Sequence, residues 1–209
     1  MRKLLLSAAG AALLSTPASA AVTVLTFEGI GNLNPVGGFY APNYFFSPAT
    51  LALVDIDAGG SGNFANEPSP NTIMFFLDAN NAILNVPAGF TTGFSFFYSS
   101  AVAATVTVYD GLNATGNVLG VINLAAQAFD NCTGDPTGAF CNWTRVGVAF
   151  AGTAYSIDFA GTANFTGFDN ITFGRDRPVI PEPGVWAMLI AGFGLVGCAV
   201  RRRRTALAA

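Results

Sequence analysis

The segment ATVTVYD, residues 104–110, shows most clearly how this chain folds. Apolar and polar side chains alternate along it, so that Val106 and Val108 lie on one face while the two threonines and Tyr109 lie on the other. Successive side chains of a β-strand point to opposite faces of the sheet. The segment therefore predicts an antiparallel strand with one face in a core and the other toward solvent.

Similar segments occur along most of the chain, rich in Val, Ile, Phe, Tyr and Thr and separated by turn signals such as Asp110-Gly111. This spacing is typical of a β-sandwich. We expect an all-β fold, a single antiparallel, jelly-roll-like β-sandwich of about nine strands, with barrel closure as the alternative. The expected strands lie in residues 22–27, 50–55, 72–77, 82–86, 92–98, 104–110, 118–124, 143–150, 155–160 and 166–173.

The first residues, MRKLLLSAAGAALLSTPASA, have the three parts of a secretory signal peptide. A cationic start is followed by an apolar stretch and then by Ala18-Ser19-Ala20, an A-x-A cleavage site. We expect a signal helix in residues 1–20 and cleavage between Ala20 and Ala21. The alternative, a permanent membrane anchor, is disfavoured because the apolar run is shorter than the roughly 20 residues that a span needs.

The part between the two ends, residues 21–178, is strongly acidic. Six of the nine basic residues and one of the twelve acidic residues lie outside it, which leaves three basic against eleven acidic residues and a net charge of −8. Such a domain repels phosphate backbones, so nucleic acid is excluded as a partner. The chain has no histidine, and its one lysine is Lys3. Histidine triads, histidine–metal clusters and lysine Schiff bases are therefore excluded.

Two of the three cysteines, Cys132 and Cys141, close a short loop that contains Gly and Pro. In an exported protein such a pair predicts a disulfide. The alternative, a metal-binding pair, lacks further soft ligands. Cys198 lies in the C-terminal apolar run, where a small membrane-embedded residue is expected rather than a reactive thiol.

Carboxylate and amide oxygens are the available metal ligands, and they suit hard cations such as calcium. Glu28 ends the first expected strand, Asp169 lies in the last one, and Asp55 and Asp57 frame the segment VDIDAGG. The first and last strands of a jelly roll can lie side by side, so Glu28 and Asp169 could meet in a structural calcium site. The alternative is that all four are solvated turn residues.

Two kinds of carbohydrate function are open to such a domain. Exposed aromatic rings present an apolar face to a sugar, and the candidates are Tyr40, Tyr44, Tyr98, Tyr109 and Trp143, although core packing is the alternative for each. A glycosidase would need two carboxylates across a cleft. Glu67, in the Gly/Asn/Pro/Ser-rich segment 57–71, is the candidate general acid. That segment is expected to be either a binding loop at one end of the sandwich or a loop without function.

The C-terminal stretch PEPGVWAMLIAGFGLVGCAVRRRR places an uncharged segment, residues 185–200, before four arginines, Arg201, Arg202, Arg203 and Arg204. As a helix the uncharged segment would span about 24 Å, slightly less than a ~30 Å hydrocarbon core, which local thinning accommodates. The arginines are expected to stay on the cytoplasmic side. The sequence predicts a single transmembrane helix that holds the exported domain at the inner membrane.

This stretch resembles the PEP-CTERM sorting signal in its PEPxxWA variety, on Pro181, Glu182, Pro183, Trp186 and Ala187 followed by the glycine-interrupted helix and the arginines. The resemblance implies recognition by an exosortase, a membrane cysteine protease/transpeptidase of Gram-negative bacteria. It further implies removal of the tail near the PEP motif, and release or attachment at the cell surface or in the extracellular matrix. Substrates of exosortases accompany exopolysaccharide production and the biofilm matrix.

The opening FE and the closing GFDNI of the central part are similar to those of jelly-roll carbohydrate-binding modules, in which acidic residues matching Glu28 and Asp169 hold structural calcium. We therefore expect a signal peptide (1–20), an extracellular β-sandwich (21–178) and a sorting tail (179–209). The expected activity is non-catalytic carbohydrate binding. The alternatives are a polysaccharide-modifying enzyme that uses acidic residues and a purely structural matrix role.

The sorting tail gives a direct prediction about the mature protein. Intact-mass analysis of material recovered from the cell exterior is expected to show a chain that begins at Ala21 and ends before Trp186, because the membrane segment is removed during export. An exterior protein that still contains Trp186 and the four arginines would contradict this prediction.

Overall fold

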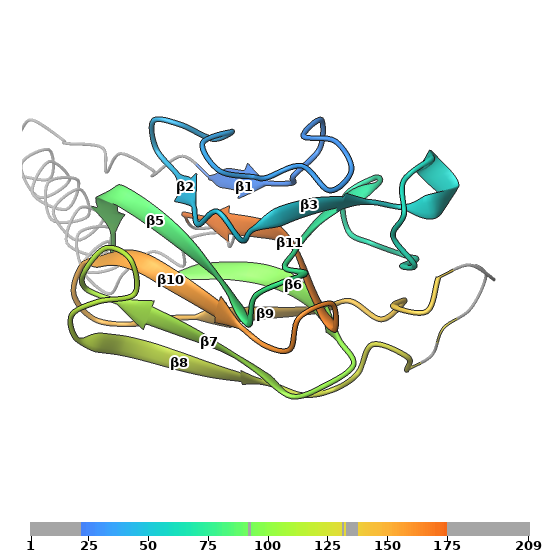
Figure 1. The fold of residues 1–209 in the computed structure, drawn as a ribbon. Coiled ribbons are helices and arrows are strands. Elements are labelled where there is room, and N and C mark those ends of the chain that lie inside the picture. Colours follow the sequence, from blue (N-terminus) through green and yellow to red (C-terminus); the bar gives the residue numbers. More distant parts are fainter. Residues whose placement is uncertain (1–21, 92, 131, 133–137, 175–209) are drawn as a thin grey trace, which may run out of the picture.

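The computed structural model describes residues 22–91, 93–130, 132 and 138–174 (Figure 1). The expected signal peptide with its cleavage site (Ala18, Ala20 and Ala21), the sorting motif and the arginine cluster lie outside these residues. Within the described part, no helix is long and apolar enough to cross a membrane.

The described residues form eleven strands and a 3₁₀ helix, η1 (Ile56–Ala58). The strands are β1 (Thr23–Leu25), β2 (Phe45–Phe46), β3 (Leu51–Val54), β4 (Thr72–Phe75), β5 (Asn81–Phe90), β6 (Phe94–Ser100), β7 (Ala104–Tyr109), β8 (Val118–Leu124), β9 (Thr144–Val148), β10 (Ala154–Ala160) and β11 (Thr166–Phe173).

Two antiparallel sheets lie face to face as the two layers of a jelly-roll-like sandwich (Figure 1). The six-stranded sheet has the order β3-β4-β11-β6-β9, with β1 also paired to β11, and the five-stranded sheet has the order β2-β5-β10-β7-β8. One edge of β11 is shared by two strands, because β4 pairs with its first residues and β1 with its last. The first and last strands are therefore neighbours, as the sequence predicts.

Alternation along the strands produces one continuous core between the sheets. In β7, Val106 and Val108 are buried while the residues between them are half-buried, as predicted. Phenylalanine rings meet across the two layers: Phe159 of β10 lies 5.0 Å from Phe168 of β11 and 5.5 Å from Phe96 of β6, measured between ring centroids. Aromatic burial is thus the main contact between the sheets.

All ten expected segments contain a strand, but the prediction of about nine strands is too low. The one strand outside the ten expected segments is β2, which has only two residues, too few for any periodic pattern to show. Strand β5 runs on through Pro87 to Phe90, beyond the expected end at residue 86. The two sheets remain separate in their pairing, so the barrel alternative is wrong.

Candidate functional site

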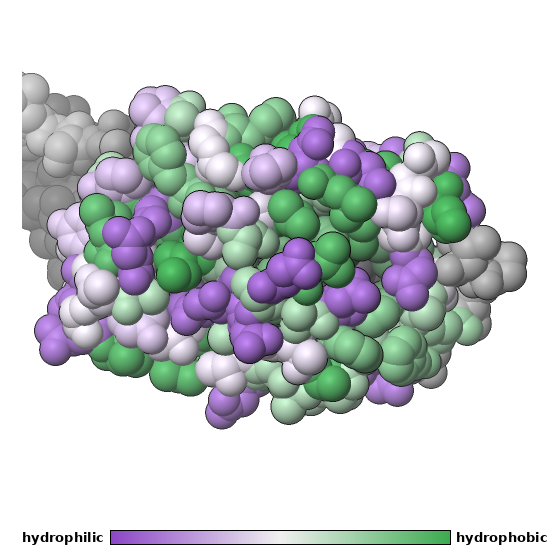
Figure 2. All heavy atoms as spheres, in the orientation of Figure 1, coloured by the Kyte–Doolittle hydropathy of each residue, from purple (hydrophilic) through white to green (hydrophobic). Residues whose placement is uncertain are grey.

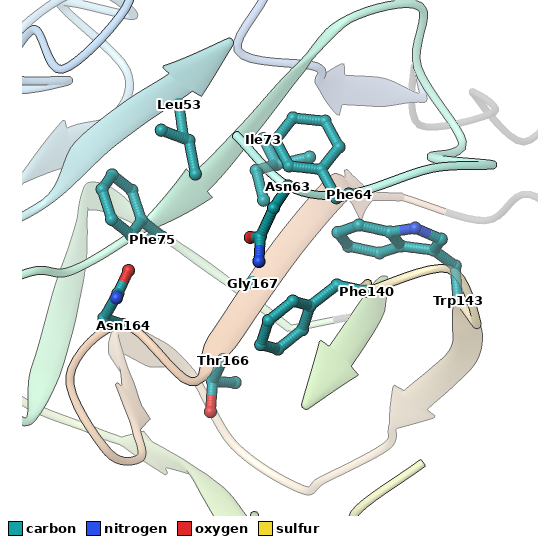
Figure 3. A pocket seen from close by; sticks show the side chains of 10 residues that line it. All are labelled: Leu53, Asn63, Phe64, Ile73, Phe75, Phe140, Trp143, Asn164, Thr166 and Gly167. Carbon is teal, nitrogen blue, oxygen red and sulfur yellow. The ribbon is translucent and has the colours of Figure 1, made fainter. Parts of the chain in front are cut away.

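A small pocket lies on the outer face of the six-stranded sheet (Figure 3). Its volume is about 20 Å³, which is room for a single water-sized or methyl-sized group. Three adjacent strands, β3, β4 and β11, form its floor, and loops that contain residues 63–64 and 140–143 form its walls. The lining residues are Leu53, Asn63, Phe64, Ile73, Phe75, Phe140, Trp143, Asn164, Thr166 and Gly167.

Gly167 of β11 lets the indole of Trp143 approach the sheet. A Cβ at this position would lie 2.8 Å from Ile73 Cδ1 and 3.3 Å from Trp143 Cη2. A glycine within a strand often marks a place where another group approaches the backbone closely. The absence of a side chain therefore lets Ile73 and Trp143 pack directly against the backbone of β11 at the pocket.

The walls of the pocket are held together by contacts between two loops far apart in sequence. Phe64 and Phe140 form a β-bridge, and the Trp143 indole N–H donates a hydrogen bond of 3.0 Å to the Ala65 carbonyl. Phe64 is buried and meets the Trp143 ring edge-on. The predicted disulfide between Cys132 and Cys141 is present in the second loop. These contacts fix the orientation of the indole before any ligand arrives.

Two asparagine amides provide polar groups at the pocket. Asn63 and Asn164 are exposed, and no hydrogen bond joins either side-chain amide to another described residue. Figure 3 shows the Asn63 amide directed toward the space between the lining side chains. The Thr166 hydroxyl points away from it and lies 2.7 Å from the Ser100 hydroxyl. The pocket thus combines aromatic and aliphatic surface with two side-chain amides that form no hydrogen bond to another described residue.

Sequence reasoning identified only part of this pocket. Trp143 is one of the five candidate aromatics, and segment 57–71 supplies Asn63 and Phe64. Among the other candidates, Tyr98 is buried in the core, Tyr44 stacks on Phe173, and Tyr40 accepts a hydrogen bond from the Phe27 N–H. Tyr109 is half-buried on the five-stranded sheet.

Glu67, the candidate general acid, is half-buried and does not line the pocket. None of the described lining residues is acidic. The pocket itself therefore offers no carboxylate for the general acid–base chemistry of a glycosidase.

Glu28 and Asp169 reach the same short segment, residues 69–72. Glu28 accepts hydrogen bonds from the Asn71 N–H (3.0 Å), the Thr72 N–H (2.8 Å) and the Thr72 hydroxyl (3.1 Å). Asp169 is fully buried and accepts from the Ser69 N–H and hydroxyl, each at 2.8 Å, and from the Asn170 N–H at 2.6 Å. Glu28 does not end the first strand as expected: β1 stops at Leu25 and Glu28 lies in the turn after it. The two carboxylates therefore fasten this segment to that turn and to β11.

Burial raises the pKa of the Asp169 carboxyl to about 7, because the charged form loses its hydration. Hydrogen bonds from Ser69 and Asn170 act in the opposite direction, and the negative charge of Glu28 adds to the rise. Burial also raises the pKa of the nearby Tyr40 hydroxyl, with smaller contributions from Asp169 and Glu28. The negative charge of Asp169 is thus costly in the folded protein.

The described residues supply only part of a calcium site. Calcium takes about six to eight oxygen ligands, whereas the oxygens of Glu28 and Asp169 already accept hydrogen bonds from protein donors. Asp55 lies at the end of β3 and Asp57 is exposed in η1. No group of three or more His, Cys, Asp or Glu side chains that could hold a metal occurs in the described part of the chain. As the structure describes it, the pair does not fit a complete calcium site, and calcium binding stays a prediction.

Comparison with known proteins concerns the C-terminal residues first. Residues 179–204 match the family model of the PEP-CTERM protein-sorting motif. The chain carries a PEP-CTERM sorting motif. The motif implies processing by an exosortase and secretion through the membrane to the cell exterior. No curated protein matches the sequence.

Solved structures resemble the central sandwich. The K2 cleaved adhesin domain of Lys-gingipain superposes with a TM-score of 0.50 at 16% identity, over 74% of this chain and 100% of that chain. A family 6 carbohydrate-binding module has a TM-score of 0.39 at 13% identity, over 74% of this chain and 94% of that chain. A carbohydrate-binding module from Cellvibrio mixtus lichenase 5A has a TM-score of 0.34 at 16% identity, over 62% of this chain and 88% of that chain. The adhesin domain supports the β-sandwich fold alone, and the two lower scores carry no argument.

The raised pKa of Asp169 predicts a pH-dependent stability. The folded state holds the proton up to about pH 7, whereas an unfolded aspartate releases it near its ordinary pKa of about 3.9. Stability that is present below about pH 4 is therefore lost progressively as pH rises toward 7. Thermal unfolding between pH 4 and 8 is expected to show this decline, and Asp169→Asn should reduce it. Equal slopes for both proteins would contradict the prediction.

The calcium hypothesis makes a separate prediction. If calcium binds at Glu28 and Asp169, the melting temperature should be higher in calcium than in chelator, because a ligand that binds only the folded state stabilises it. Asp169→Ala should abolish the difference, while Asp78→Ala, at an exposed residue between β4 and β5, serves as the control. Equal melting temperatures of the unaltered protein in calcium and chelator would refute the hypothesis.

Proposed function

We propose that the exported β-sandwich binds carbohydrate at the pocket beside Trp143 and does so without catalysing a reaction. The observation that carries the proposal is the fixed indole: its N–H is committed to Ala65, while the ring remains only partly buried beside two free amides. An aromatic ring offers an apolar surface to the C–H groups of a sugar, and amides pair with its hydroxyl groups.

The fixed position of Trp143 favours binding. A side chain that is already ordered loses little conformational entropy when a ligand stacks on it. Two described features supply this order, the hydrogen bond to Ala65 and the edge-on contact with buried Phe64. The site is therefore pre-organised on the ligand-free protein.

Charge and location agree with an extracellular carbohydrate ligand. The central part is acidic, as the composition shows, and the sorting motif implies delivery to the exterior. We propose that residues 21–178 form the exported domain and that its ligand belongs to the exopolysaccharide of a biofilm matrix on a Gram-negative cell. The face seen in Figure 2 mixes hydrophilic and hydrophobic residues.

A direct binding measurement tests the proposal. Isothermal titration of the exported protein with soluble polysaccharides is expected to show binding that Trp143→Ala weakens at least about tenfold, or about 1.4 kcal/mol. Tyr109→Ala, on the opposite sheet, is the matched control and should bind normally. Unchanged binding by Trp143→Ala would refute the site.

A parallel hydrolysis assay on the same polysaccharides distinguishes binding from catalysis. Binding without turnover is expected. Turnover that is lost in Glu67→Gln would instead support the alternative of a polysaccharide-modifying enzyme, and its carboxylates would have to act outside this pocket.

A further inference from the structure

We infer that the pocket selects sugar residues that carry an acetamido group, as in an N-acetylhexosamine. This inference rests on the proposed carbohydrate-binding function and specifies its ligand. The methyl group of the acetamide would enter the hollow beside Leu53, Ile73 and Phe75, and the amide would meet Asn63 and Asn164 at its mouth. Size, polarity and charge of the pocket each support this assignment.

The size of the hollow suits one small substituent. A volume of about 20 Å³ accommodates one methyl-sized group. In the proposed arrangement the sugar ring lies against the indole while a substituent points inward. An acetamide projects its methyl group away from the ring, which allows both contacts at once.

The polarity of the floor favours a methyl over a hydroxyl group. Leu53, Ile73 and Phe75 contribute only hydrocarbon, and Gly167 contributes no side chain. A hydroxyl placed among them would lose its hydrogen bonds to water, whereas a methyl group gains by leaving water. The floor therefore favours a methyl substituent over a hydroxyl substituent.

The two amides match the polar half of an acetamide. An asparagine side chain has an N–H₂ donor and a carbonyl acceptor, and an acetamide has one N–H and one carbonyl. Neither Asn63 nor Asn164 has a side-chain hydrogen bond to the described residues, so both are available to a ligand. Figure 3 shows them on different sides of the lining, with Asn63 nearer to Trp143 and Asn164 nearer to Phe75.

The charge of the site disfavours other common substituents. All ten lining residues are uncharged. A glucosamine ammonium or a uronate carboxylate would be desolvated in the hollow without an opposite charge beside it, which is costly. Of hydroxyl, amino, carboxylate and acetamido substituents, the last is the one for which the hollow and its mouth supply complementary groups.

A comparison of matched glycans tests the inference on the exported protein. Titration with N-acetylglucosamine tetramer is expected to give a dissociation constant at least about tenfold lower than titration with cellotetraose or glucosamine tetramer. Equal affinities for these ligands would overturn the acetamido inference and leave the proposed carbohydrate-binding function intact. Absence of binding to any glycan would overturn both. An O-acetylated glycan that binds as tightly as the N-acetylated one would overturn the role of the N–H group.

Variants locate the selectivity in the pocket. Asn63→Ala should remove most of the preference for the acetylated tetramer, and Asn43→Ala, at another exposed asparagine, should retain it. Gly167→Ala should also reduce the preference, because its Cβ would displace the Ile73 and Trp143 side chains that line the hollow. Binding of cellotetraose should persist in Asn63→Ala, which shows that the fold is intact. A preference that survives in Asn63→Ala would overturn the inference.

Discussion

Strand β11 has hydrogen-bonded neighbours along both edges, and the alternation of its side chains separates the core from the polar features of the molecule. Phe168 and Ile171 point into the sandwich, where they are fully buried. Gly167 and Asp169 belong to the opposite face, where one forms the pocket floor and the other binds segment 69–72. Phe168 and Ile171 share the core face because a β-bulge between Asp169 and Thr172 shifts the alternation by one residue. Core, pocket and carboxylate pair therefore depend on the same pairing.

Burial of the Asp169 carboxylate lowers the stability of the fold, and its hydrogen bonds hold segment 69–72 in place. Donors on segment 69–72 and Asn170 compensate part of the desolvation cost, and the neighbouring Glu28 increases it. The backbone beside both acids is unusual, with φ of 65° at Phe27 and 48° at Asn170, a region that residues other than glycine seldom occupy. Strain and buried charge at one place indicate that the position of this loop is strongly constrained.

Most strands could be predicted because they show period-two alternation, and the neighbouring first and last strands follow from the jelly-roll topology. Strand β2 could not, since two residues carry no period. The pocket was found only in part. Its walls meet through Phe64 and Phe140 and through the Trp143–Ala65 hydrogen bond, which spans 78 positions of the chain. Hydrophobic periodicity within one segment contains no information about which distant loops touch, so Asn164, Phe140 and Gly167 were missed.

The direction of β11 decides on which side of the sandwich the sorting motif follows. The pocket lies at the first residues of this strand, and the chain leaves at its far end, next to β1. Six residue steps separate Gly167 from Phe173 in the sequence, roughly 20 Å along an extended strand. The chain therefore leaves the sandwich at the end of β11 opposite the pocket. If the predicted membrane segment holds the precursor, the proposed site would remain accessible, so removal of the tail and glycan binding need not occur in a fixed order.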